Sequence, residues 1–378
     1  MDTKAILRHV EKRGGWIRDT LHELVQQESP SEDRQAVNAA MALAEHCARE
    51  QGASIKRHKQ REFGDVLELH FGPTRSKQKP VLLLSHLDTV WPIGTLKKMP
   101  WREADGRYWG PGVLDMKAGV VMALAALSAL REMKSTRPVT LLLNSDEEVG
   151  SPISRAITER LALDSAAVLV LEPAQGLAYK TARKGVGHYH VEVTGVAAHS
   201  GVDFEKGHSA VLELAKLIQT ISGFTNLARK LTVNCGVISG GTRSNVVASE
   251  AWTEVDVRIA KASDAAYVEK LFRRLKVSDP HCKLTITGGI NRPPMERKAG
   301  TIALFKKARA IAAELGFSLE EAATGGGSDG NFTAALGVPT LDGMGAVGDG
   351  AHAAHESVVI EHLVPRTALL AAMIASVE

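Results

Sequence analysis

Three short apolar segments, each ending in residues that bind metal ions, constrain the fold more than any other feature of the sequence. They are VLLLSHLD (81–88), VTLLLNSDEE (139–148) and AVLVLEP (167–173). Apolar runs of this length are typical of strands buried on both faces, as in parallel sheets. A helical segment, DMKAGVVMALAALSALREM (115–133), lies between the first two, and we expect it to begin at Asp115. The alternation predicts an α/β domain with a mostly parallel sheet flanked by helices.

A second region, from about residue 182 to 290, has a different pattern. HYHVEVTG (188–195) alternates polar and apolar residues, as a half-exposed strand does. Segments typical of a helix, two strands, a helix and a strand follow it. The order β-α-β-β-α-β is that of a ferredoxin-like unit. We therefore predict an inserted α+β domain at 182–290, within a discontinuous domain formed by 1–181 and 291–378.

Composition excludes several classes of protein. The net charge of +3 over 378 residues, with no basic block that contains aromatic residues, argues against nucleic acid as a partner. No stretch approaches the roughly 20 apolar residues of a membrane span, and the longest, AGVVMALAALSAL, is expected to be a buried helix. MDTKAILRHVEKRGGWIRDT predicts an amphipathic helix rather than a signal peptide. The three scattered cysteines fit a reducing cytoplasm and argue against disulfides.

The polar residues that follow the three strands should converge in space. Carboxyl ends of parallel strands share one edge of the sheet, where ligands gather. The residues that we expect there are His86, Asp88, Asp115, Glu147, Glu148 and Glu172. Buried carboxylates without a counter-charge are costly, so this cluster predicts a bound cation. Imidazole together with carboxylate favours zinc or its neighbours over magnesium and calcium, and two metals bridged by one carboxylate are common in hydrolases.

Each of these residues also has a structural interpretation when it is taken alone. His86 is then a surface histidine, Asp115 a helix N-cap and the pair Glu147–Glu148 part of a solvated loop. Their joint occurrence at successive strand ends favours the metal site.

Nine short motifs, in a fixed order, make a family resemblance specific. They are SHLDTV, GPGVLDMKAG, NSDEEVGS, LEP, AAHSG, GGTRSNVV, DVR, GGGSDGN and GAHAAHE. From about residue 15 to the C-terminus, the chain resembles the co-catalytic zinc metallopeptidase and deacylase family. That family includes acetylornithine deacetylase, succinyl-diaminopimelate desuccinylase, aminoacylase and the bacterial glutamate carboxypeptidases, and the last branch is the most similar.

The resemblance implies a site with two metal ions. His86 and Glu172 correspond to ligands of one ion, Glu148 and His352 to ligands of the other, and Asp115 to the bridge. Two zinc ions per chain are the implied cofactors, with cobalt or manganese as alternatives. The peptide bond after Asp115 is expected to be cis.

The last histidine ligand has two candidates, His352 and His355. A spacing of four residues before Glu356 favours His352, but chains of the family vary in length at this loop, which keeps His355 as the competitor.

The resemblance also implies roles in catalysis. Glu147 corresponds to the general base, and Asp88 to the carboxylate that orients His86. His199 corresponds to a histidine that stabilises the oxyanion in the partner subunit's site; its structural alternative is a turn histidine. Asp146 has no implied role.

Substrate binding is implied for four further residues. Asn245 and Arg258 correspond to residues that hold the substrate carboxylate, and Gly326 and Ser328 lie in the glycine-rich loop near the substrate. Otherwise Arg258 is a strand arginine in a surface pair. Ala248 departs from the family pattern, which has proline there, and this affects the loop more than the chemistry.

We therefore expect a cytoplasmic metal-dependent hydrolase that cleaves an N-acyl amino acid or small peptide with a free carboxylate. A homodimer formed through the inserted lid domain is expected by resemblance. The alternatives are an acetylornithine-type deacylase or dipeptidase, and a catalytically inactive member that acts as a binding or scaffold protein. A single structural zinc site is disfavoured, because such sites are usually rich in cysteine.

Overall fold

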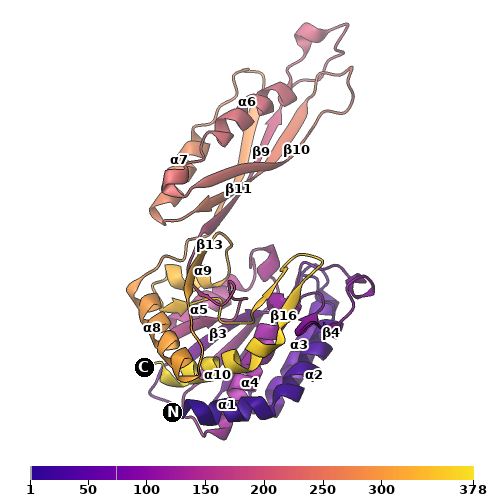
Figure 1. The fold of residues 1–378 in the computed structure, drawn as a ribbon. Coiled ribbons are helices and arrows are strands. Elements are labelled where there is room, and N and C mark those ends of the chain that lie inside the picture. Colours follow the sequence, from indigo (N-terminus) through magenta and orange to yellow (C-terminus); the bar gives the residue numbers. More distant parts are fainter. Residues whose placement is uncertain (1, 74) are drawn as a thin grey trace. The chain divides into compact units, whose positions relative to one another are not determined.

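The computed structural model describes residues 2–73 and 75–378, which divide into two compact units. The first unit comprises Met1–Ala182, Arg297–Ala323 and Ser328–Glu378. The second comprises Arg183–Glu296 and Thr324–Gly327. Figure 1 shows the helices and strands of both units.

The first unit is built on a six-stranded sheet with the strand order β1-β2-β6-β3-β7-β14. The strands are β1 (Ser54–His58), β2 (Val66–Phe71), β6 (Val139–Asn144), β3 (Val81–His86), β7 (Ala167–Val170) and β14 (Thr340–Leu341). Strands β6, β3, β7 and β14 run parallel, whereas β1 and β2 pair antiparallel. The predicted parallel-rich sheet is therefore confirmed.

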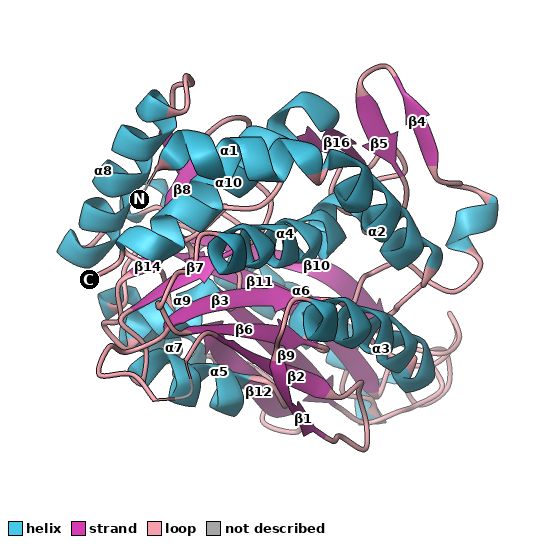
Figure 2. Cartoon of the chain, turned by 90° about the horizontal axis from the view of Figure 1, so that it is seen from below, coloured by secondary structure: helices cyan, strands magenta, loops and turns pink. Residues whose placement is uncertain are grey.

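Helices cover both faces of this sheet (Figure 2). Alternate residues of β3 face opposite sides, so that Leu83 lies in one apolar cluster and Leu82 in another. The helices of the larger cluster are α1 (Thr3–Lys12), α2 (Gly14–Gln26), α3 (Arg34–Glu50), α4 (Ala118–Glu132), α8 (Ala299–Glu314) and α10 (Ile360–Ser376). On the opposite face lie α5 (Arg155–Leu163) and α9 (Gly330–Ala335).

Two predicted helix boundaries are wrong. The N-terminal helix is interrupted at Arg13, where Gly14 and Gly15 weaken helix propensity. Helix α4 begins at Ala118, because Asp115 (φ −115°, ψ 95°) and Met116 have non-helical backbone angles. Asp115 is thus no N-cap. The Asp115–Met116 peptide bond is cis, as the resemblance implied.

Helix α4 with its preceding turn, Val113–Glu132, is long and apolar enough to cross a membrane by length and composition. However, 94% of its apolar window is buried inside the molecule, against helices such as α1, α2 and α10. It is the core helix that the sequence predicted.

A small antiparallel sheet, with the order β15-β16-β5-β4, lies beside the strand ends. Its strands are β4 (Arg102–Ala104), β5 (Arg107–Trp109), β15 (Gly348–Asp349) and β16 (Ser357–Val359). Ser357 pairs with Trp109, which places Glu356 beside the turn that leads to Asp115. A further two-stranded pair joins β8 (Tyr179–Arg183) and β13 (Glu321–Thr324).

The second unit is an antiparallel sheet, β10-β11-β9-β12, with two helices packed on one face. Its elements are β9 (Gly185–Thr194), α6 (Ala210–Ser222), β10 (Thr232–Gly240), β11 (Glu250–Ile259), α7 (Ser263–Arg273) and β12 (Lys283–Arg292). Their order along the chain is β-α-β-β-α-β, and the ferredoxin-like arrangement is confirmed.

Candidate active site

Three parallel strands bring the predicted acidic residues and one histidine to the same edge of the sheet. His86 is the last residue of β3, Glu147 and Glu148 follow β6 in a short turn, and Glu172 follows β7. Because β3 lies between β6 and β7, its end is adjacent to both of the others. His86 is 1% exposed, which excludes the surface-histidine interpretation.

The imidazole of His86 is oriented by Asp88 and faces two carboxylates. Its Nδ1 lies 3.0 Å from the carbonyl oxygen of Asp88 and 3.4 Å from Asp88 Oδ1. With the proton on Nδ1, Nε2 presents its lone pair toward Asp115 Oδ1 at 3.3 Å and Glu172 Oε1 at 3.5 Å. Burial alone would lower the pKa of His86, but Asp115, Asp88 and Glu172 outweigh it and raise the pKa well above its ordinary value.

Asp115 lies between two halves of the cluster. Its Oδ1 faces His86, whereas its Oδ2 lies 3.4 Å from Nε2 of His352. The same His352 nitrogen lies 3.3 Å from Oε2 of Glu148. Asp115 and, to a smaller extent, Glu148 raise the pKa of His352 to about 10. The carboxylate of Asp115 therefore has one oxygen directed at each histidine, as a bridging ligand requires.

The ligand atoms of this cluster are better placed to bind a cation than to form hydrogen bonds with one another. Two overlapping groups have ligand atoms within 4.8 Å: His86, Asp115 and Glu148, and His86, Glu147 and Glu172. Three atoms in them are buried and have no hydrogen-bond partner among residues 2–73 and 75–378: His86 Nε2, Asp115 Oδ1 and Glu148 Oε1. Buried acceptors that face each other without donors are costly, and a divalent cation would satisfy all three.

Asp88 holds the turn that carries the two glutamates. Its Oδ1 accepts from the backbone nitrogen of Glu147 (3.2 Å), and its Oδ2 accepts from that of Glu148 (3.1 Å) and from Ser31 Oγ (2.8 Å). The side chain of Asp88 is completely buried. One carboxylate thus fixes both the His86 ring and the glutamate pair. No sequence signal pointed to Ser31.

Glu356 organises the turn around Asp115, a role that the sequence analysis missed. Its carboxylate accepts from the backbone nitrogens of Gly112 (2.9 Å), Leu114 (2.8 Å) and Asp115 (3.0 Å) and from Trp91 Nε1 (2.7 Å). Glu356 is 1% exposed. The sequence signal for this role is the spacing of four residues between His352 and Glu356.

The structure brings His352, and not His355, to the acidic cluster. His352 adopts φ +61° in the turn before Glu356, with its imidazole between Asp115 and Glu148. Among the described residues, no ion pair or potential metal group includes the exposed His355.

Asp146, which had no predicted role, anchors the other side of the glutamate turn. Its Oδ2 accepts from the backbone nitrogens of Ile153 (2.7 Å) and Ser154 (3.2 Å), and its carbonyl oxygen accepts from that of Ser151 (2.8 Å). Burial raises the pKa of Asp146 although these bonds oppose the shift. The third acid of the run is therefore structural.

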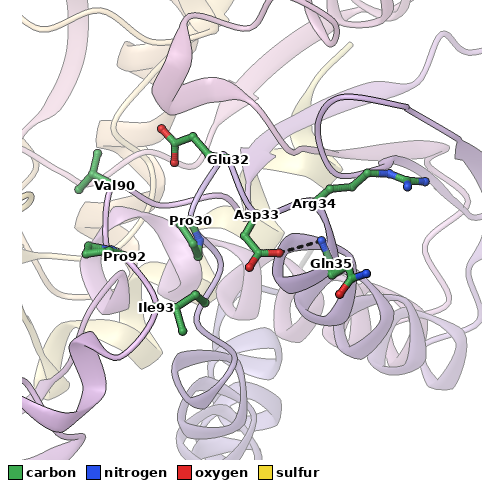
Figure 3. Close-up of a pocket in the computed structure, with 8 residues that line it drawn as sticks. All are labelled: Pro30, Glu32, Asp33, Arg34, Gln35, Val90, Pro92 and Ile93. Atoms are coloured by element: carbon green, nitrogen blue, oxygen red, sulfur yellow. Dashed lines mark hydrogen bonds between the residues drawn. The ribbon is translucent and has the colours of Figure 1, made fainter.

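A cavity of about 420 Å³ borders the loop that follows Asp88 (Figure 3). Its apolar lining consists of Pro30, Val90, Pro92 and Ile93, and its polar lining of the residues 32–35. The loops on its two sides are joined where Ser31 N donates to the carbonyl oxygen of Thr89 (3.3 Å). Its volume lies in the range of small-molecule sites.

The second unit holds His199 and Asn245 on neighbouring loops. Ser200 N donates to the carbonyl oxygen of Asn245 (3.0 Å), and His199 forms a backbone bridge with Val246. The His199 ring is exposed and its Nδ1 accepts from Gly201 N at 3.2 Å. The two residues are brought together, while their catalytic and binding roles stay predictions.

The remaining three predicted substrate residues have partners within the fold. Arg258 makes bidentate contact with Asp256 (2.8–3.1 Å), which matches its structural alternative, a paired strand arginine. The carbonyl oxygen of Gly326 accepts from Arg183. Ser328 is fully buried and donates its hydroxyl to Asp342 at 2.6 Å. Their role in substrate binding also stays a prediction.

Comparison with known proteins is consistent with this geometry. Residues 82–376 match the model of the peptidase family M20/M25/M40. The chain is 31% identical to carboxypeptidase G2 of Pseudomonas sp. (strain RS-16), over 93% of this chain and 87% of that protein.

Solved structures share the fold at lower identity. A tripeptidase from Staphylococcus aureus has a TM-score of 0.81 and 22% identity, over 96% of this chain and 98% of that one. An M20 family metallo-carboxypeptidase, Sso-CP2 from Sulfolobus solfataricus, has a TM-score of 0.75 and 18% identity, over 95% and 98%. These likenesses support the fold and not a particular substrate.

Proposed function

Because this chain belongs to the peptidase family M20/M25/M40, we propose that it is a di-metal hydrolase of the glutamate-carboxypeptidase type. Membership of this family means a peptidase that uses divalent metal. The proposed substrate is an N-acyl amino acid or small peptide with a free carboxylate. The similarity to carboxypeptidase G2 supports cleavage next to a carboxyl-terminal residue.

One observation carries the proposal: Asp115 directs one oxygen to each of two histidine–carboxylate pairs. His86 and Glu172 would hold one ion, His352 and Glu148 the other, and Asp115 would bridge them. Zinc is the ion proposed, because imidazole and carboxylate together suit it, with cobalt and manganese as alternatives. When bound, two such ions lower the pKa of water and polarise the scissile carbonyl.

Glu147 is the proposed proton carrier. Its carboxylate belongs to the group formed with His86 and Glu172, and its backbone is pinned by Asp88. From there it would accept a proton from the attacking water and donate one to the leaving amine. Glu148, one residue further, belongs to the group formed with His86 and Asp115, and it also lies beside His352. The two adjacent glutamates thus share His86 but belong to different groups, which supports a division between base and ligand.

The second unit is proposed to complete the site in a dimer. His199 would stabilise the oxyanion in the partner subunit, and Asn245, Arg258, Gly326 and Ser328 would form the substrate-binding surface. An exposed edge strand, β10, with Val237 (52% exposed) and Ile238 (63% exposed), supports pairing with a second copy. The three free cysteines support a cytoplasmic location.

A substrate screen with metal-reconstituted protein tests the function. We expect hydrolysis of N-acyl-glutamate or folate-type substrates after loading with about two zinc ions per chain. Preferred hydrolysis of N-acetylornithine or of dipeptides would instead identify a deacylase or a dipeptidase. Fewer than about two metals per chain after zinc reconstitution, with no hydrolysis of any of these substrates, would contradict the enzyme and favour the binding protein.

A further inference from the structure

A second cavity, of about 320 Å³, lies at the end of the sheet away from the strand ends described above. It is lined by the start of β6 (Val139), the end of β2 (Phe71), the turn after α3 and the last turns of α4. Val139 and the Asp146–Glu148 turn lie at opposite ends of β6, which separates the cavity from the acidic cluster by roughly 16 Å. It therefore has no part in the proposed catalysis.

Arg137, a lining residue of this cavity, is buried, and two of its three guanidinium nitrogens have no hydrogen-bond partner among the described residues. It is 7% exposed, and its Nε and Nη2 find neither solvent nor an acceptor within the described residues. Burial lowers the pKa of Arg137, but a guanidinium remains a cation at every accessible pH. A buried cation without acceptors is costly, so a feature absent from the isolated chain is expected to satisfy it.

The two orphaned nitrogens have a particular geometry. Nε and Nη2 form the edge of the guanidinium that donates two parallel hydrogen bonds to a carboxylate or phosphate. This chemistry differs from that of a lone nitrogen, which a single water molecule could satisfy.

The charge of the cavity lining points to the same class of ligand. A second arginine, Arg131, lines the cavity, and its Nη1 donates to the carbonyl oxygen of Glu50 at 2.9 Å. No acidic side chain is among the described lining residues, and the polar ones besides the arginines are Gln51 and Ser135. Two cations without a lining carboxylate are complementary to an anion.

We propose that this cavity is a binding site for a small oxyanion, a carboxylate or a phosphate ester, held by the guanidinium groups of Arg137 and Arg131. The volume admits a ligand of metabolite size. The Nε–Nη2 edge of Arg137 is closed to solvent in the chain alone, so the side chain has to turn this edge toward the anion, while the exposed Arg131 also lines the cavity. The site is distinct from the metal cluster, so the anion affects stability without being the substrate.

Thermal unfolding in sulfate, with acetate as the carboxylate probe and chloride as the reference at equal ionic strength, tests the proposal. Sulfate is used because it does not remove the metals of the loaded protein. We expect the midpoint of the wild type to rise by at least about 2 °C in sulfate. Arg137→Leu and Arg131→Gln should lose this rise and keep the turnover of the wild type. Arg18→Gln, at an exposed arginine that pairs with Asp19, is the control and should keep the rise.

The response of the charge-preserving variant sharpens the test. Arg137→Lys keeps the cation but not the two-pronged edge, so we expect its sulfate-dependent rise to be at most half that of the wild type. It also serves if Arg137→Leu does not fold. An equal rise in the wild type, Arg137→Lys and Arg131→Gln would overturn the proposal, and so would the absence of any rise in the wild type.

Discussion

At the scale of single residues, the neighbours of Glu147 and Glu148 predict opposite effects for the same substitution. Glu147→Gln removes a proton carrier and keeps the size of the side chain. We expect kcat to fall about 10²–10⁴-fold with unchanged metal content, because proton transfer is lost and the five proposed ligands remain. Glu148→Gln removes a ligand beside His352, and we expect it to release one metal per chain.

Metal analysis of both variants by atomic emission, together with steady-state kinetics, checks these outcomes. Asp146→Asn is the matched control within the same acidic run, because among the described residues its carboxylate accepts from the backbone at 153 and 154 and not from a proposed ligand. Loss of metal in Glu147→Gln with retention in Glu148→Gln would reverse the assignment of base and ligand.

Glu356 is predicted to be a positioning residue, not a catalytic one. In Glu356→Gln the amide nitrogen that replaces one carboxylate oxygen cannot accept, so two of the four donors around it lose their partner. We expect a loss of about 1–3 kcal/mol in the free energy of unfolding and metal affinity weakened about 10–100-fold. Trp91→Phe removes only one of the four donors and should have a much smaller effect. Chemical unfolding and competition with a chelator provide the two measurements.

At the scale of elements, Glu68 connects β1, β2 and α5 through charge. Its carboxylate accepts from His58 Nε2 (2.8 Å) and Arg160 Nη2 (2.9 Å), and Lys56 lies 3.3 Å away. Burial alone would raise the pKa of Glu68, but the hydrogen bonds from His58 and Arg160 and the charges of Arg160 and Lys56 outweigh it and lower the pKa to about 2. None of the proposed metal ligands is among these partners of Glu68.

The sign of the shift fixes the pH dependence. A carboxylate whose pKa is lowered in the folded state stabilises the fold at a pH above its pKa in the unfolded chain, near 4.5. This stabilisation is lost as the pH falls toward 2. Glu68→Gln should therefore lower the free energy of unfolding by about 1–2 kcal/mol at pH 7, and by progressively less as the pH falls below 4.5. Urea unfolding of both proteins between pH 7 and 3.5 measures the difference. A constant difference across this range would contradict the ion-pair origin.

The elements differ in how far the sequence predicts them. The apolar runs of β3, β6 and β7 place His86, the two glutamates and Glu172 at one sheet edge, because burial and parallel pairing act through local patterns. The turn around Asp115 could not be derived in this way. Its hydrogen bonds come from Glu356, 241 residues later, so the local pattern gave a helix start that the tertiary contact overrides.

At the scale of the whole molecule, the buried cluster predicts that metal stabilises the first unit. His86, Asp115 and Glu148 each have one buried atom without a hydrogen bond within the part of the chain that the structure describes. Removal of metal by a chelator should therefore lower the midpoint of thermal unfolding by several degrees, and added zinc should restore it in a concentration-dependent way. Calorimetry of Asp115→Asn provides the control, since it should respond less to zinc. An identical midpoint with and without chelator would contradict a metal linked to folding.

The proposed dimer, in which the second unit of one subunit completes the partner's site, can be tested by mixing two inactive variants. If His199 acts in the partner's site, a heterodimer of Glu147→Gln and His199→Ala contains one intact site. Half of the dimers in an equal mixture are of this kind, so activity should recover to about a quarter of the wild type. If His199 acts within its own chain, no dimer contains an intact site and no activity returns. Ile238→Lys, on the exposed edge strand, should abolish the recovery and give a monomer by light scattering. Full recovery of dimer mass in this variant would place the interface elsewhere.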